Sequence, residues 1–364
     1  MLGLVISLII ALALYALLLI FYGDVMHAAR NGFELWLNSV MPALFPFMVC
    51  ASILQQSGVL NKLFSYHSHK SRIKRFLSSL AVFVICNISG LPAGARVYGY
   101  QLNHSTANIR TTYLCSYSNL SGPMFIIGAL CTGMLKEPWL AVPICISHYG
   151  TAMLLYLGIN MSSTSQHHVT YTADKTDTSL PSIITSSITS GLDGMLKICA
   201  TIVFFMVVIT ALECTGLLNA ISSVFAWFGM DATVVKASIT GILELTNGCA
   251  VLQYSNADIR LVSAFSSAIL SFGGLCVYFQ ARAFIKIPFG AYVLSKVIHS
   301  ASAFGIAYMI TPLFDDYSQS VFATMEEETL FANSYVGLIV IISCLFVLTL
   351  ILLSSKLVSP KKQT

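Results

Sequence analysis

Polar residues together with the helix breakers Gly and Pro interrupt four apolar segments of this 364-residue chain. The interruptions lie at Asn87–Gly94, Ser118–Pro123, Glu244–Gly248 and Ser271–Gly274. A helix that begins inside a membrane presents unpaired N–H groups and a partial positive charge, which suit an anion. Irregular backbone survives at membrane depth only where protein or a wet cavity satisfies its polar groups. The four interruptions therefore predict an internal cavity that binds a small molecule.

The candidate substrate-binding residues lie in and beside these interruptions. Glycines let a ligand approach the backbone, amides and hydroxyls offer neutral hydrogen bonds, and ionisable groups at membrane depth are costly enough to suggest function. The set is Asn87, Ser89, Gly90, Gly94, Arg96, Ser118, Asn119, Ser121, Glu244, Thr246, Asn247, Ser271, Gly273 and Gly274. The alternative for each polar residue is that it only satisfies the backbone of its own broken helix.

Four ionisable residues have more specific candidate roles. Arg96 can form a bidentate pair with a substrate carboxylate, or it can extend its charge to water at the interface. Glu244 can bind a proton or a cation, or pair with Arg96 or Lys296. His148 and His299 are candidates for gating or proton relay. A lone His in a membrane span is, however, more often a packing residue.

The composition predicts an all-α, polytopic integral membrane protein, because 56% of the residues are hydrophobic and only 9% are charged. The ten cysteines form no CxxC pair, so neither a metal site nor another cofactor is expected. The net charge of +4 comes without a basic–aromatic patch, which argues against a nucleic-acid partner. No GxSxG, HExxH, DDxxD or Walker pattern occurs, and the spans hold few carboxylates, so an enzyme is not expected.

Six uninterrupted segments are long enough to cross a hydrocarbon core of ~30 Å. They are Leu2–Tyr22, Leu35–Gln55, Pro138–Gly158, Asp193–Leu212, Phe289–Thr311 and Tyr335–Leu353. The interrupted segments are Phe76–Tyr100, Thr111–Leu135, Thr233–Gln253 and Leu261–Phe279, of which the first and third are interpreted as re-entrant hairpins. The first span lacks the basic region and cleavage site of a signal peptide, so we expect it to be uncleaved.

The basic residues predict the orientation of these spans. With the N-terminus inside, thirteen of the nineteen Lys and Arg residues lie in the cytoplasm and four lie outside. Cytoplasmic loops carry this excess of positive charge in membrane proteins. We therefore expect cytoplasmic termini, a cytoplasmic basic cluster at Lys62–Arg75 and an external acidic loop at Asp315–Glu328.

Four landmarks recur in the same order in the two halves of the chain. A Phe precedes a Gly by 11 residues in both, a broken hairpin carries Gly94 or Gly248, and a break carries Ser121 or Ser271. A histidine, His148 or His299, then follows that serine by 27 or 28 residues. Each half has an odd number of crossings, so the halves are expected to be inverted. Inverted repeats of broken helices are the plan of many secondary transporters.

These landmarks resemble the YlbJ-type sporulation integral membrane proteins, within the wider nucleoside-recognition (Gate) domain superfamily. The resemblance covers Gly32 to Tyr308 and is carried by Leu35–Phe47, Ser89–Arg96, Ser118–Gly128, His148–Tyr149, Gly241–Gly248, Ser271–Leu275 and Gln280. The chain departs from the family pattern in having Leu91 for Tyr, Arg96 for Lys, and Gly122 for the Ser of a Ser-Pro pair.

The resemblance implies a transporter of a small carboxylated metabolite, similar to dipicolinate, that acts in sporulation. A nucleoside or other neutral substrate, and a non-transport sporulation scaffold, are the alternatives. The expected partners are the substrate, a coupling proton or cation, and the lipid of the cell membrane or of the outer forespore membrane; a homo-oligomer is left open. The expected organisation is an N-terminal transmembrane helix (1–30), a Gate-like repeat (31–158), a cytoplasmic linker (159–189), an inverted repeat (190–312), and an outer loop with a last span (313–364).

Overall fold

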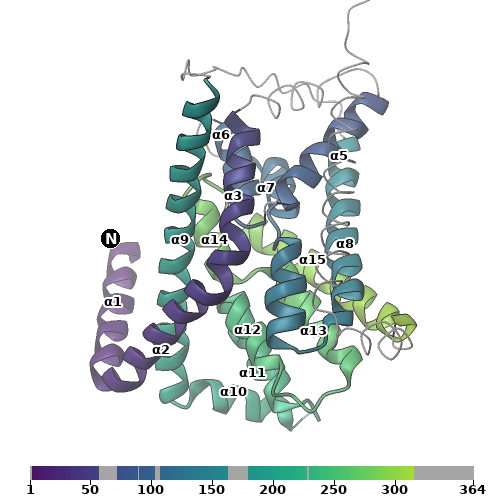
Figure 1. The fold of residues 1–364 in the computed structure, drawn as a ribbon. Helices are drawn as coiled ribbons and strands as arrows, with labels where there is room; N and C mark the ends of the chain where they lie inside the picture. The colour runs from purple at the N-terminus through teal and green to yellow at the C-terminus, as the bar shows by residue number, and fades with distance from the viewer. Residues whose placement is uncertain are drawn as a thin grey trace, which may run out of the picture.

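The structure, a computed structural model, describes residues 2–56, 72–88, 90–102, 107–162, 179–227 and 229–314. These residues form helices and no extended β-strand (Figure 1). The helices are α1 (Leu2–Ile20), α2 (Tyr22–Leu35), η1 (Trp36–Val40), α3 (Met41–Gln56), α5 (Arg72–Ile88), α6 (Ala93–Gln101), α7 (Ile109–Ser118), η3 (Phe125–Met134), η4 (Pro138–Leu140), α8 (Ala141–Met161), α9 (Leu180–Cys214), α10 (Leu217–Ala226), α11 (Ala232–Leu243), α12 (Leu245–Leu252), α13 (Ile259–Phe272), α14 (Gly274–Arg282), α15 (Phe289–Ile310) and η5 (Thr311–Phe314).

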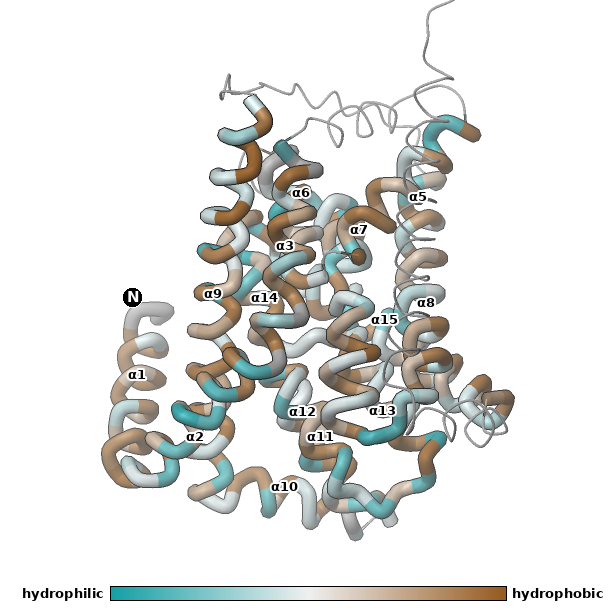
Figure 2. Tube along the Cα trace, viewed as in Figure 1, coloured by the Kyte–Doolittle hydropathy of each residue, from teal (hydrophilic) through white to brown (hydrophobic). Residues whose placement is uncertain are grey.

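The described helices confirm a polytopic helical membrane protein. Four stretches are long and apolar enough to cross a bilayer, namely Pro138–Met161, Leu180–Cys214, Ile259–Arg282 and Phe289–Phe314. The bent pair of α1 and α2 gives a fifth if it counts as one span. Figure 2 shows hydrophobic residues recurring along α8 and α9. Large apolar side chains on both helices are exposed, such as Leu154 and Phe204, where water would penalise them and lipid would not.

The first predicted span forms α1, but the chain does not leave it in a straight line. It bends by 98° into α2, which is amphipathic and buries Val25, Ala28 and Gly32. The chain then continues through the π-helical segment η1 into α3, whose apolar stretch Leu44–Ile53 is shorter than the four candidate spans. The predicted second span Leu35–Gln55 is thus helical throughout, and Figure 1 shows it beside α9.

Helices α2, η1 and α3 pack along the long helix α9. Small residues allow the close approach, since a Cβ on Gly32 would lie 3.2 Å from the Val203 Cα atom. The indole N–H of Trp36 donates to the Met195 carbonyl oxygen at 3.1 Å in this buried seam. The seam fixes α9 against the first half of the chain.

The predicted linker 159–189 begins and ends in helix. Helix α8 continues to Met161, and α9 begins at Leu180. The Ser-rich first turns of α9 contact α3, where Gln56 donates to the Ser187 hydroxyl at 3.0 Å. These serines serve as helix contacts, a role that their composition alone did not indicate.

Helices α7, α8, α13 and α15 form a second packed group, joined by polar contacts between their buried faces. The hydroxyls of Ser147 on α8 and Ser267 on α13 lie 2.9 Å apart. The Ser300 hydroxyl on α15 donates to the Ala268 carbonyl oxygen on α13 at 2.9 Å. Small residues and interhelical hydrogen bonds of this kind hold helices together where lipid removes the hydrophobic driving force.

The two halves of the chain place their broken helices toward opposite ends of the molecule. Figure 1 shows α5, α6 and α7 toward one end of the molecule and α11, α12 and α13 toward the other. The helices α8 and α15 meet between them, where the rings of His148 and His299 stack with centroids 5.2 Å apart and an interplanar angle of 26°. The inverted orientation of the two repeats stays a prediction.

Several predictions fall outside the described residues and stay predictions. They are Ser89 as a binding residue, most of the basic cluster before Arg72, the acidic loop Asp315–Glu328, the last span Tyr335–Leu353 and the C-terminus.

Candidate functional site

The first two breaks touch each other through glycine. The break between α5 and α6 contains Gly90, which adopts a left-handed φ of 71°, and the break between α7 and η3 contains Gly122. A Cβ on Gly90 would lie 2.9 Å from the Gly122 backbone nitrogen. Both the backbone conformation and the lack of space therefore require glycine at Gly90.

The last two breaks touch in the same manner. Glu244 separates α11 from α12 in an extended conformation, and Gly273, at φ 79°, separates α13 from α14. A Cβ on the next residue, Gly274, would lie 3.0 Å from the carbonyl oxygens of Gly241 and Leu243. Each half thus brings its own two breaks into contact.

The repeat glycines Gly94 and Gly248 both lie where two backbones meet. A Cβ on Gly94 would lie 2.2 Å from the Ser118 carbonyl oxygen, so α6 packs directly on the end of α7. A Cβ on Gly248 would lie 2.3 Å from the Gly241 Cα atom, so α12 folds back on α11. We conclude that these two glycines serve helix packing, which leaves ligand contact to their neighbours.

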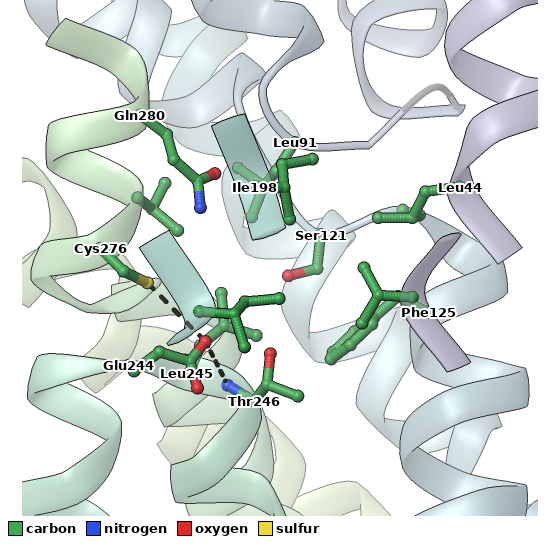
Figure 3. Close-up of a pocket in the computed structure, with 14 residues that line it drawn as sticks. Leu44, Leu91, Ser121, Phe125, Ile198, Glu244, Leu245, Thr246, Cys276 and Gln280 are labelled. Atoms are coloured by element: carbon green, nitrogen blue, oxygen red, sulfur yellow. Dashed lines mark hydrogen bonds between the residues drawn. The ribbon is translucent and has the colours of Figure 1, made fainter. Parts of the chain in front are cut away.

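One small cavity of about 40 Å³ lies where the breaks of the two halves meet (Figure 3). It has room for a few water molecules, since one needs ~10–15 Å³. First-turn residues of three half-helices border it: Phe125 of η3, Leu245 of α12 and Cys276 of α14. The complete lining is Val40, Leu44, Leu91, Ser121, Gly122, Phe125, Ile198, Ile202, Glu244, Leu245, Thr246, Cys276, Val277 and Gln280.

Glu244 is the carboxylate in this lining, and it caps α12. Its Oε1 accepts the Thr246 backbone N–H at 3.0 Å, and its Oε2 accepts the Asn247 backbone N–H at 2.7 Å. The residue is 1% exposed and forms none of the ion pairs found among the described residues. The protein's own carboxylate therefore occupies the N-terminus that the sequence predicted as part of an anion site.

Ser121 reaches the cavity from the opposite half. It is 3% exposed, and its hydroxyl has no hydrogen-bond partner in the structure. Figure 3 shows this hydroxyl pointing into the cavity, toward the side where Glu244 and Gln280 lie. A buried hydroxyl without a partner costs about 1–3 kcal/mol, so its position favours a ligand or water there.

Other predicted residues satisfy the backbone of their own helix. The Ser118 hydroxyl donates to the Leu114 carbonyl oxygen at 2.8 Å, and the Asn87 amide donates to the Phe83 carbonyl oxygen at 2.9 Å. Both residues are buried and neither lines the cavity. For Asn87 and Ser118, the contacts present are therefore those of residues that satisfy the backbone of their own helix.

Two more predicted residues connect elements. The Asn119 Oδ1 accepts the Ala95 backbone N–H at 3.2 Å and so ties α6 to the end of α7. The Ser271 hydroxyl lies 2.8 Å from Nδ1 of His148 and so ties α13 to α8. Asn119 keeps one amide nitrogen without a partner, which leaves a donor for a ligand if the break opens.

Arg96 lies one turn into α6 and does not line the cavity. Its guanidinium donates to the Ser190 carbonyl oxygen on α9 at 3.2 Å and to the Ser190 hydroxyl. It also lies over the Phe284 ring, 5.4 Å from the centroid. Its contact with a substrate carboxylate stays a prediction and would require the guanidinium to leave α9.

The histidine pair has no exposure and is held from both halves. His299 Nε2 lies 2.9 Å from the His148 carbonyl oxygen, the geometry of a donated N–H. One ring nitrogen of each residue, Nε2 of His148 and Nδ1 of His299, has no partner. The pair lies away from the cavity lining, so gating or proton relay by these residues stays a prediction.

Lys296 lies on α15, and the sequence indicated only that it could pair with Glu244. It is 1% exposed, and its ammonium group donates to the carbonyl oxygens of Ser116 at 2.9 Å and Asn119 at 3.3 Å. These carbonyls end α7, where the helix dipole is negative. Lys296 therefore caps the broken helix of one half and Glu244 that of the other. The two charges do not pair with each other within the described ion pairs.

Most of the cavity wall is apolar. These apolar residues were not among the binding residues predicted from the sequence. Val40 and Leu44 belong to the Leu35–Phe47 segment, which is one of the segments that carry the family resemblance. Gln280 is another residue that carries this resemblance. Ile198 and Ile202 come from α9 and have no motif that marks them. Apolar side chains line most ligand pockets, but in a membrane chain they cannot be distinguished from core residues by type.

Comparison with known proteins gives one relevant similarity. The chain is 22% identical over 347 residues to the "Sporulation integral membrane protein YlbJ" of Bacillus subtilis (strain 168), covering 85% of this chain and 84% of that protein. This finding confirms the YlbJ-type resemblance. No protein-family model and no solved structure matches the chain.

Membership of the wider Gate superfamily stays a prediction from the motifs. The relative's description names an integral membrane protein, in agreement with the apolar helices described above.

Proposed function

We propose that this YlbJ-type chain is a transporter that moves a small carboxylated metabolite, of the dipicolinate type, across a membrane during sporulation. The observation that carries the proposal is the meeting of four broken helices, two from each inverted half, around one cavity. The relative's description as a sporulation integral membrane protein supports the setting. The cell membrane or the outer forespore membrane is the proposed location.

The arrangement supports transport because the cavity lies at the boundary between the two halves. Secondary transporters place substrate at such a boundary and alternate its access by moving one half against the other. The present volume of about 40 Å³ is far below the ~300 Å³ of a typical small ligand pocket. The cavity is therefore too small for such a substrate as it stands, and the proposed transport requires the halves to separate before a substrate enters.

The half-helix termini favour an anionic substrate. The N-terminal turns of η3, α12 and α14 border the cavity, and each contributes a partial positive charge of about half a unit. Glu244 offsets the end of α12 but not those of η3 and α14. Two electropositive ends suit a molecule with two carboxylates, and they act without charged side chains that would need desolvation.

A neutral substrate such as a nucleoside is the second candidate, and one observation favours it. The described lining contains neither Lys nor Arg, whereas it contains the carboxylate of Glu244. A negatively charged Glu244 near the site disfavours binding of an anionic substrate, unless the Glu244 charge is neutralised.

Uptake by the purified full-length chain in liposomes tests the proposal. The cavity variant Ser121→Leu fills the space between the breaks, and Ser223→Leu makes the same change at an exposed position on α10. We expect labelled dipicolinate to enter wild-type and Ser223→Leu vesicles at similar rates, and Ser121→Leu vesicles at least tenfold more slowly. Uptake of labelled uridine without dipicolinate would favour the second candidate. Uptake of neither compound would refute transport and favour a scaffold.

A further inference from the structure

We propose that Glu244 and the facing Ser121 hydroxyl form a coupling-cation site, which takes a proton or Na⁺ and must be occupied before the anionic substrate binds. The inference rests on the proposed function for its second half, the link to substrate. The first half, cation binding, stands on the geometry of the closed cavity and can be measured without any substrate.

The first step is the unbalanced charge of the cavity. Glu244 is 1% exposed, and among the described residues it forms no ion pair with Lys, Arg or His. Two of its hydrogen bonds come from backbone N–H groups of α12, which supply only a partial positive charge, and a weak third comes from the Cys276 thiol at 3.9 Å. An isolated buried carboxylate is costly, and the cost disappears when a proton or a metal cation joins it.

The second step is the oxygen-rich side of the cavity. Ser121 reaches it from the first half with an unpartnered hydroxyl, and Figure 3 shows the Thr246 hydroxyl on the same side of the space as Glu244. Oxygen ligands suit hard cations such as Na⁺, and a carboxylate with nearby hydroxyls also suits a proton carried by water. The volume of about 40 Å³ has room for an ion or for a few waters.

The third step is the set of titratable groups around Glu244. Cys276 of α14 places its Sγ 3.9 Å from Oε1. Cys249 is fully buried in α12, the short helix that Glu244 caps. Lys236 on α11 is engaged with Glu213 at 2.8 Å, at the end of α9. Among the described residues, no Lys, Arg or His forms an ion pair with Glu244, so none takes the place of the proposed cation.

The fourth step links the cation to the substrate. A carboxylated substrate at the N-termini of η3 and α14 would share the cavity with the Glu244 carboxylate and be repelled by it. Binding of a cation to Glu244 removes this repulsion, so each ligand raises the affinity for the other. Because Ser121 and Glu244 belong to opposite halves, an occupied site also holds the halves together. The result is symport of the acid with the cation.

Direct cation binding to the purified full-length protein tests the first half. We expect the wild type to bind ²²Na⁺, or to show in infrared difference spectra a carboxyl group that titrates, and Glu244→Gln to lose that signal. Ser121→Ala keeps the cap of α12 intact and should weaken cation binding at least threefold, which keeps the test valid if Glu244→Gln folds poorly. Glu213→Gln, at a half-buried ion pair outside the cavity lining, should behave as wild type. Neither signal in the wild type, or the same signal in Glu244→Gln, would overturn the site.

Uptake in proteoliposomes tests the second half, with separate arms for an inward proton gradient and an inward Na⁺ gradient. We expect one gradient to raise dipicolinate uptake by wild-type protein at least tenfold, and neither to stimulate Glu244→Gln. Substrate uptake that ignores both gradients would overturn the coupling and leave the proposed function standing. Cation binding without any substrate uptake would refute the proposed function and leave the cation site standing.

Discussion

Replacing Gly248 with Ala separates the close packing of α12 on α11 from the general effect of removing a glycine. The added Cβ would lie 2.3 Å from the Gly241 Cα atom and 2.9 Å from the Ala237 carbonyl oxygen. Both contacts are backbone, so no side chain can rotate away, and the hairpin must open. Overpacking of this kind costs about 1–3 kcal/mol, or more when backbone has to move.

The matched control is Gly150→Ala on α8, where a Cβ would meet nothing within 4 Å. In an open helical position this change stabilises by roughly 0.5–1 kcal/mol. We therefore expect the two variants to differ by about 2 kcal/mol or more, with Gly248→Ala the less stable. Opening the hairpin also moves Glu244, so this variant should lose cation binding as well.

Thermal unfolding of the detergent-purified variants, followed by size-exclusion chromatography of the heated samples, measures the difference. We expect the midpoint temperature to be highest for Gly150→Ala, lower for the wild type and lowest for Gly248→Ala. Equal midpoints for the two alanine variants would refute the close backbone contact and, with it, the folded-back hairpin that positions Glu244.

Two further predictions concern the buried lysine and the orientation. Lys296→Met keeps the side-chain length but removes the donor to the Ser116 carbonyl oxygen, so the free energy of unfolding should fall by about 1–3 kcal/mol in a thermal unfolding experiment. The control is Lys197→Met, which removes an exposed ion pair with Asp193 and should change the free energy of unfolding by less than about 0.5 kcal/mol. Impermeant maleimide should label Asn256→Cys but not Ser162→Cys on intact cells, in a background without native cysteines, because the charge bias places the α12–α13 loop outside; the opposite labelling would reverse the topology.

Broken helices could be predicted from local sequence because glycine, proline and polar residues act within a few residues of where they stand. All four predicted interruptions coincide with breaks in the described helices. The repeat landmarks Gly94 and Gly248 could be matched by their order alone, and both prove to be sites of close backbone contact.

The partners of the ionisable residues could not be predicted, because they depend on segments far away in the chain. Arg96 donates a hydrogen bond to Ser190 on α9, and Lys296 donates one to the Ser116 carbonyl oxygen at the end of α7. Glu244 shows the limit most clearly. Its neighbours in sequence made it a cap, but only the tertiary structure shows that no described Lys, Arg or His forms an ion pair with it.

Composition and local sequence thus determined the membrane class and the helical breaks of this protein, since both follow from hydropathy and backbone preference over short stretches. Only the tertiary structure decided which break residues face the cavity. Ser121, Glu244 and Thr246 do, whereas Asn87 and Ser118 turn back to their own helices. The reason is physical: a polar side chain at a break has a backbone partner within reach, and packing alone determines whether it takes that partner or faces a ligand.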